Sequence, residues 1–152
     1  MPLYFAYGSN LDAAQMAARC NQPKLVGIAF LKDHRFVFAG VSPNRENMGV
    51  GSMQRAENCQ LAGVVWDITD DDLRALDAKE GYPKRYSRAQ MQVTDLHGKT
   101  HATYVYFKTN EAPLNPPCQA YLNQVVQAYD AHGFDSAVLY AAYEEARKSR
   151  YG

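Results

Sequence analysis

This sequence of 152 residues has few cysteines, no long apolar run and no net charge. The three cysteines, Cys20, Cys59 and Cys118, are odd in number and widely spaced, which excludes a disulfide framework and a Cys-x-x-Cys pair and favours a reducing compartment. No segment approaches the roughly 20 apolar residues of a membrane-spanning helix, and no basic stretch precedes an apolar run at the N-terminus. We therefore expect a cytoplasmic protein with no signal peptide and no membrane partner.

The charges balance, because 16 basic residues face 16 acidic ones. A chain without net charge has no global field that attracts nucleic acid, so no nucleic-acid partner is expected. Small basic clusters, such as Lys84-Arg85 and Arg147-Lys148, are interpreted as solvated faces. The length is that of one ordinary domain, and neither a repeat nor a linker divides it, so residues 1–152 are predicted to form a single domain. The sequence carries no signal for an oligomeric state.

The N-terminal half is predicted to alternate strands with single helices. A strand over Leu3–Tyr7 and a short helix over Asp12–Cys20 come first. Leu25–Leu31 and His34–Ala39 alternate around Lys32-Asp33 and predict a hairpin. The polar segment Ser42–Gln60 is too long for an ordinary loop, so it is either functional or contains a short strand near Gly49–Gln54.

The second half has clearer boundaries. Leu61–Ile68 is a buried strand, and Thr69 is the N-cap of a helix that Gly81 ends. Tyr86–Asp95 and Thr100–Lys108 form a hairpin, and a proline-rich loop follows over Asn110–Pro117. Two helices close the chain, one ending at Gly133 and one beginning near Asp135. This order of elements predicts a mixed α+β domain rather than a doubly wound parallel sheet.

The turn Tyr7-Gly8-Ser9-Asn10-Leu11 joins the first strand to the first helix. Glycine lets successive backbone N–H groups converge into a concavity, and Ser9 and Asn10 add side-chain donors. The N–H groups at the start of the following helix lie close by. We predict that this turn binds a carboxylate or an oxyanion of a small ligand; the alternative is a well-capped turn without a ligand.

Glu80 is the last residue before the helix-ending Gly81. The negative end of the helix dipole disfavours a carboxylate at this position, and partial burial beside Tyr82 and Tyr86 acts in the same direction. Both effects raise the pKa of Glu80, and a general base that works near neutral pH needs a raised pKa. The alternative is an exposed Glu80 that pairs with Lys79 or Lys84.

Other candidates are weaker. His97 and His101 are four residues apart, but Gly98 places a turn between them, so we predict no metal site. Cys118 begins a helix, which can lower a thiol pKa, but no histidine is placed by a motif to activate it.

Four segments together resemble the γ-glutamylcyclotransferase-like (AIG2-like) family. They are Phe5-Ala6-Tyr7-Gly8-Ser9-Asn10-Leu11, Gly63-Val64-Val65-Trp66, Leu76-Asp77-Ala78-Lys79-Glu80-Gly81 with Tyr86 after it, and Pro117-Cys118-Gln119-Ala120-Tyr121. The first and third are specific when they occur in this order. The fourth has Cys118 where the family usually has serine, and Gly133 matches the glycine after that helix.

The resemblance implies a small mixed β-barrel with flanking helices and a cavity between the turn and the glutamate. It implies an enzyme that converts a γ-glutamyl amine or amino acid to 5-oxoproline and a free amine, without cofactor or metal. Glu80 would be the acid/base, and the backbone of Gly8 to Leu11 would hold the substrate carboxylate, the oxyanion or both. Tyr7, Tyr86 and Tyr121 would shape the pocket and bind the substrate.

Two alternatives stay open. The first is another enzyme on the same scaffold, acting on γ-glutamyl-ε-lysine, on γ-glutamylated intermediates or on an unrelated amide. Glutathione is a less expected substrate, because the longer relatives that degrade it have a different sequence at the N-terminal motif. The second is a non-catalytic domain that binds a small ligand or a partner in the same pocket. The Ser42–Gln60 and Asn110–Pro117 segments are candidate lids of that pocket.

Overall fold

Two long strands form the frame of the molecule in the computed structural model, which describes residues 2–109 and 111–151. β2 (Lys24–Ser42) and β3 (Met48–Asp67) pair antiparallel along their length, from Lys24 opposite Asp67 to Ser42 opposite Met48. With β1 (Leu3–Ala6), β4 (Ser87–Asp95) and β5 (Thr100–Phe107) they close a barrel in the order β1-β3-β2-β4-β5. β1 pairs in parallel with β5 and so closes the barrel.

The predicted hairpin at Lys32-Asp33 is wrong, because the chain continues straight through it as β2. Asp33 takes a left-handed φ of 61° and shifts the register between Lys32 and His34. Its side chain accepts a hydrogen bond from the Asn58 N–H of β3 at 3.1 Å. A dipeptide that looks like a turn is therefore a β-bulge, which bends a strand without reversing it.

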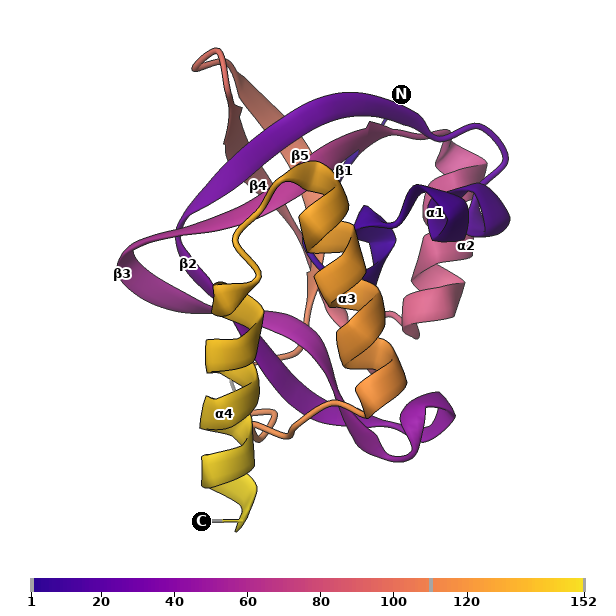
Figure 1. Cartoon of the computed structure of the whole chain (residues 1–152). Helices are drawn as coiled ribbons and strands as arrows, with labels where there is room; N and C mark the ends of the chain where they lie inside the picture. Colours follow the sequence, from indigo (N-terminus) through magenta and orange to yellow (C-terminus); the bar gives the residue numbers. More distant parts are fainter. Residues whose placement is uncertain (1, 110, 152) are drawn as a thin grey trace.

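The polar segment Ser42–Gln60 contains far more strand than the short one expected. After a short 3₁₀ turn, η2 (Pro43–Arg45), β3 begins at Met48 and runs without interruption to Asp67. The true reversal of the chain is therefore η2, at the tip of the long β2–β3 hairpin. Figure 1 shows this hairpin sweeping across the molecule, with its tip beside the start of α3.

The helices lie where capping chemistry predicts them. α1 (Ala13–Arg19) is capped by the Asp12 carboxylate, which accepts from the Ala14 N–H at 2.9 Å. α2 (Asp70–Glu80) begins with a capping box between Thr69 and Asp72 and ends at Gly81, whose φ of 70° is left-handed. α3 (Gln119–His132) ends likewise at Gly133, and α4 (Ala137–Tyr151) follows.

The helices cover different parts of the barrel. α1 contacts α2, α3 contacts the 3₁₀ turn η1 (Ser9–Leu11), and α4 contacts β2 (Figure 1). Buried aromatic rings fill the space between the barrel and α3, where Phe36 meets Tyr7, Phe38 and Tyr129 edge to face. This packing holds Tyr7, which follows the end of β1 and begins the predicted turn. No helix in the described ranges is long and apolar enough to cross a membrane.

Candidate active site

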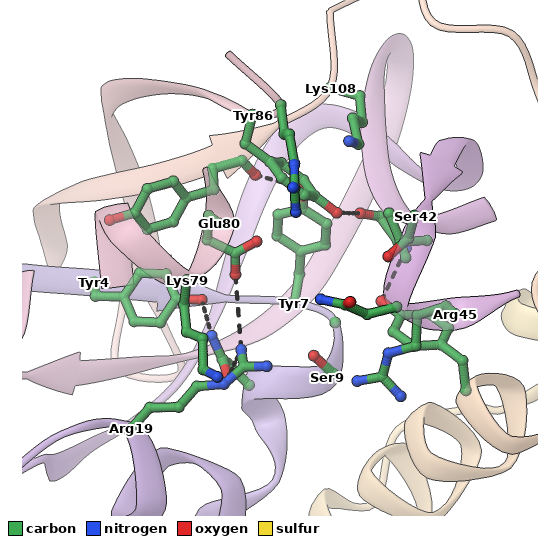
Figure 2. A pocket seen from close by; sticks show the side chains of 18 of the residues that line it. Tyr4, Tyr7, Ser9, Arg19, Ser42, Arg45, Lys79, Glu80, Tyr86 and Lys108 are labelled. Atoms are coloured by element: carbon green, nitrogen blue, oxygen red, sulfur yellow. Dashed lines mark hydrogen bonds and ion pairs between the residues drawn. The ribbon is translucent and has the colours of Figure 1, made fainter. Parts of the chain in front are cut away.

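A cavity of about 310 Å³ opens between the end of β1, the end of α2 and the tip of the β2–β3 hairpin. Gly8, Ser9 and Asn10 line it from the turn, and Glu80 lines it from α2. Figure 2 shows the Glu80 carboxylate pointing toward Arg19 and Tyr7, with Ser9 of the turn nearby. Two motifs that are 70 residues apart in the sequence therefore meet at one site, as the sequence predicts.

Glu80 is largely buried, with 17% of its side chain exposed. Burial raises the pKa of Glu80, and the positive charges of Arg19 and then Lys108 partly offset this rise. The expected direction of the shift is thus confirmed, but its partners differ from those expected. The Arg19 guanidinium, not Lys79 or Lys84, lies 3.9 Å from the carboxylate. Tyr86 lines the cavity with Glu80, whereas Tyr82 is exposed.

The turn forms the 3₁₀ helix η1, directly after Gly8. The Leu11 N–H donates to the Gly8 carbonyl at 3.0 Å, and Leu11 is fully buried outside the cavity lining. The Leu11 amide is thus committed within the turn. The N–H groups of Ser9 and Asn10 lead the turn and have no partner inside it. These two amides, with that of Gly8, are the ones that the geometry offers to a ligand.

The Asn10 side chain is an internal tether. Its amide donates to the Tyr4 hydroxyl at 2.9 Å, and its Oδ1 accepts from Gln15 at 2.8 Å and from Arg19 at 3.0 Å. The Asn10 carbonyl also accepts from the Trp66 indole at 3.1 Å. Asn10 therefore joins the turn to β3 and α1 and holds Arg19 in front of Glu80. The sequence predicts Asn10 at the site, whereas nothing in the sequence around Arg19 indicates that it belongs there.

Tyrosines form the floor of the cavity. The Tyr7 hydroxyl donates to the Tyr106 carbonyl at 2.6 Å, and the Tyr86 hydroxyl donates to the Gly51 carbonyl at 2.9 Å. The Gly51 N–H donates to the Tyr121 hydroxyl at 2.9 Å, so the Tyr121 proton can be donated toward the cavity. Burial raises the pKa of Tyr7, of Tyr86 and of Tyr121, the last to about 12. These hydroxyls therefore stay protonated near neutral pH.

The lining has a strong excess of positive charge. Among the described residues that line the cavity, one is acidic, Glu80, and five are cationic: Arg19, Arg45, Lys79, Arg85 and Lys108. Lys108 is 8% exposed, and its ammonium lies 4.4 Å from the centre of the Tyr86 ring. Burial lowers the pKa of Lys108, the negative charge of Glu80 partly offsets this effect, and the charge of Arg85 adds to it. A cavity of this kind favours an anionic ligand, which the balanced overall charge did not reveal.

One of the two predicted lids borders the cavity. Val41, Ser42, Asn44, Arg45, Val50 and Gly51 line it from the hairpin tip. From the other segment, Asn110 lies outside the described residues, and residues 111–117 are absent from the lining. That segment instead supports the tip from behind, because the Asn115 side chain donates to the Gly40 carbonyl at 2.9 Å.

The remaining candidates lie elsewhere. His101 contacts the Asp95 carboxylate at 2.8 Å within the β4–β5 turn, and His97 does not join it through its ring. Within residues 2–109 and 111–151, no group of three or more His, Cys, Asp or Glu residues could hold a metal ion. Cys118 is buried and is not part of the cavity lining.

Comparisons with known proteins point to one family. The family model described as "Gamma-glutamyl cyclotransferase, AIG2-like" matches residues 4–129. Human gamma-glutamylcyclotransferase is 29% identical over 120 residues, which cover 75% of this chain, and the bovine protein is 28% identical over 121 residues, which cover 77%. The match spans 64% of the length of each of these relatives.

Solved structures share the fold. A structure described as gamma-glutamyl cyclotransferase superposes with a TM-score of 0.83 at 24% identity, covering 93% of this chain and 85% of that one. A yeast gamma-glutamyl cyclotransferase specific to glutathione superposes with a TM-score of 0.66 at 13% identity, covering 99% and 97%. The predicted α+β barrel with flanking helices is thus confirmed.

Proposed function

Because the chain belongs to the γ-glutamyl cyclotransferase, AIG2-like family, we propose that it converts a γ-glutamyl amine or amino acid to 5-oxoproline and a free amine. Glu80 is the acid/base in this proposal. The observation that carries it is the position of a largely buried carboxylate of raised pKa in the cavity that the turn also lines. The substrate is a small molecule, which the size of the cavity allows.

The reaction is an intramolecular ring closure. The α-amine of the γ-glutamyl group attacks its own γ-carbonyl, a five-membered ring forms, and the bond to the leaving nitrogen breaks. Well-oriented intramolecular attack reaches effective molarities of about 10⁵–10⁸ M, so positioning alone supplies much of the rate enhancement. The enzyme must also remove a proton from the α-ammonium and stabilise the oxyanion that develops on the γ-carbonyl oxygen.

Glu80 performs the proton transfer. An α-amino group has a pKa of about 7.7–8.0, so much of it is protonated at neutral pH and cannot attack. The ionised Glu80 takes this proton and passes it to the leaving nitrogen. A positioned carboxylate of this kind contributes about 10²–10⁴ in rate.

Arg19 and the turn each bind one anionic group of the reacting substrate, either the α-carboxylate or the oxyanion. The α-carboxylate shares a carbon with the α-amine that contacts Glu80, so it lies next to Glu80, where Arg19 stands 3.9 Å away. We assign the α-carboxylate to Arg19, because a guanidinium binds carboxylates well. The amides of Gly8, Ser9 and Asn10 are then available for the oxyanion, and one such donor contributes about 2.7–4 kcal/mol.

The tyrosines bind the substrate and form the wall of the cavity. Tyr121 has a hydroxyl proton to donate toward the cavity, so we assign it a direct contact with the substrate. Tyr7 and Tyr86 are held by backbone carbonyls and form the wall against which the ring closes. A cytoplasmic location is part of the proposal and rests on the three cysteines, all of which are unpaired.

The test is the variant Glu80→Gln, assayed for 5-oxoproline against a panel of γ-glutamyl amines and amino acids. We expect an unchanged melting temperature and a loss of turnover of at least about 10²-fold. Glu57→Gln is the matched control, because Glu57 is exposed on β3, away from the cavity. Near-wild-type turnover in Glu80→Gln would show that Glu80 is not the acid/base. Tight binding by the wild type without any turnover would favour a non-catalytic binding domain.

A further inference from the structure

The cations of the cavity stand on both sides of it. Figure 2 shows Arg19 and Lys79 beside Glu80, and Arg45 with Ser42 on the opposite side, with Tyr7 and Ser9 between them. In the part of the chain that the structure describes, Arg45 and Lys108 form no ion pair with a carboxylate. A substrate whose one anionic group binds Arg19 leaves Arg45 and Lys108 without an anionic group of the ligand.

Arg45 is held ready for a ligand. It lies in η2, at the tip of the β2–β3 hairpin, and its guanidinium carbon stacks over the Tyr121 ring, 5.0 Å from the ring centre. A guanidinium that stacks through its face keeps its N–H edge available for a carboxylate. The same Tyr121 hydroxyl accepts from Gly51, so the ring that supports Arg45 is fixed in the barrel.

Lys108 adds a second charge. Its side chain is buried, its ammonium lies on the Tyr86 ring, and it lines the cavity. The Glu80 carboxylate acts on Lys108 through its charge, but the two side chains form no ion pair. A buried ammonium without a contacting carboxylate gains from an anion placed beside it. Arg45 reaches the cavity from the hairpin tip and Lys108 from the residue after β5, so the two residues belong to independent elements that converge on one space.

We infer that Arg45 and Lys108 form a second anion subsite, which binds a carboxylate on the leaving amine. The inference rests on the proposed function and narrows it: the leaving amine is an amino acid and not a neutral amine or a polyamine. A cationic leaving group would meet like charges at this subsite and be rejected. The two subsites together would hold the substrate at both ends, with its γ-carbonyl between the turn and Glu80.

The reaction balances without a co-reactant. A bond forms between the α-nitrogen and the γ-carbon, and the bond between the γ-carbon and the leaving nitrogen breaks. The α-ammonium gives up two protons, and the leaving nitrogen takes up two as it departs as the ammonium of a free amino acid. Arg45 and Lys108 take no part in these transfers. They bind the leaving group and thereby hold the scissile bond in place.

The matched substrates are γ-glutamyl-alanine and γ-glutamyl-ethylamide, which differ only in the carboxylate of the leaving group. We expect the wild type to prefer γ-glutamyl-alanine by at least tenfold in kcat/KM. The variant Arg45→Gln is expected to lose about 10–100-fold in kcat/KM on γ-glutamyl-alanine, mainly through KM, because losing a charged hydrogen bond has an effect of this size. On γ-glutamyl-ethylamide, which lacks the carboxylate, we expect a loss of less than about twofold. Arg55→Gln, whose side chain is 72% exposed, is the control.

Arg45 is a cleaner choice than Lys108, because the charges that act on Glu80 are those of Arg19 and Lys108. Dissociation constants of both compounds, measured by calorimetry in the Glu80→Gln background with and without Arg45→Gln, separate this inference from the proposed function. Discrimination in binding that Arg45→Gln abolishes supports the subsite even if the wild type makes no 5-oxoproline. Equal binding and equal turnover of the two compounds, or an equal loss on both in Arg45→Gln, would overturn it.

Discussion

The guanidinium of Arg19 lies 3.9 Å from the carboxylate of Glu80, and both side chains are less than one-fifth exposed. Asn10 holds Arg19 there through a hydrogen bond of 3.0 Å. Burial drives the pKa of Glu80 upward, and the nearby positive charge drives it downward. The acidity of Glu80 is thus set by the balance between the depth of the cavity and a cation that the N-terminal motif positions.

The first prediction concerns this balance. Arg19→Gln removes the larger of the two charges that lower the pKa of Glu80, so its pKa rises. The base form then appears at a higher pH, and the acid limb of the profile of kcat/KM against pH moves to higher pH. Lys108→Met should move it in the same direction by less. A loss of rate at all pH values with an unmoved limb would contradict this account, and Arg74→Gln, 70% exposed, is the control.

A second prediction concerns Asp77, one turn before Glu80 in α2. Its carboxylate accepts from the Tyr106 hydroxyl at 2.6 Å and from Arg88 at 2.6 Å, which fastens the end of α2 to β4 and β5. Asp77→Asn weakens both contacts and should cost about 1.5–3 kcal/mol in the free energy of unfolding. Urea denaturation measures this cost. We expect kcat to fall with it, while the acid limb of the pH profile stays in place, unlike that of Arg19→Gln.

A third prediction uses the close approach of Gly49 to the segment before α3. A Cβ at Gly49 would lie 1.8 Å from the Asn115 carbonyl oxygen, so the backbone must move to accept it. Gly49→Ala should therefore destabilise the protein by about 1–3 kcal/mol, although alanine normally improves a strand by reducing the freedom of the unfolded chain. Denaturant unfolding gives the sign, and a stabilised variant would show that the contact yields easily.

A fourth prediction concerns acid stability. At the β4–β5 turn, the hydrogen bond between His101 and Asp95 lowers the pKa of Asp95 to about 2, and the N–H groups of Lys99 and His97 contribute to this shift. The native state therefore favours the ionised form. This stabilisation is complete above the ordinary aspartate pKa of about 3.9 and is lost as the pH falls toward about 2. Melting temperatures of Asp95→Asn should fall less steeply than those of the wild type across this range.

The exposed residue Asp130 supplies the comparison for that experiment. Asp130→Asn keeps the contacts of the β4–β5 turn, so its melting temperature should follow the wild-type curve between pH 4 and pH 2. Parallel curves for Asp95→Asn and the wild type would mean that the turn contributes nothing to acid stability.

Local signals explain which parts of the fold and site the sequence predicts. Residues within each segment predict the turn after β1 and the end of α2. Gly8 indicates the turn, and Gly81 and Pro83 indicate the end of the helix. Asp33 gives a wrong prediction of a hairpin, because a polar residue with positive φ occurs in β-bulges as well as in turns. Whether the strand reverses or continues depends on pairing with β3, a partner about 25 residues away, and periodicity alone carries no such information.

The cations of the cavity escape prediction for a related reason. Arg19 comes from α1, Arg45 from η2 and Lys108 from the residue after β5. Each alone is an ordinary surface-type residue in a chain with no net charge. Only closure of the barrel brings them together. Glu80 is different, because its unfavourable place at a helix end is visible from the sequence itself.

The position of η2 at the tip of the β2–β3 hairpin has a consequence for how such a site can diversify. The groups assigned to ring closure lie on the barrel, on α1, α2 and α3, and on the turn after β1. Arg45 instead projects from η2, a connection with no buried residue. Residues 42–48 can therefore change in length and sequence while the rest of the cavity is inherited intact. The amine that is released and the chemistry that releases it can evolve as separate traits of one small protein.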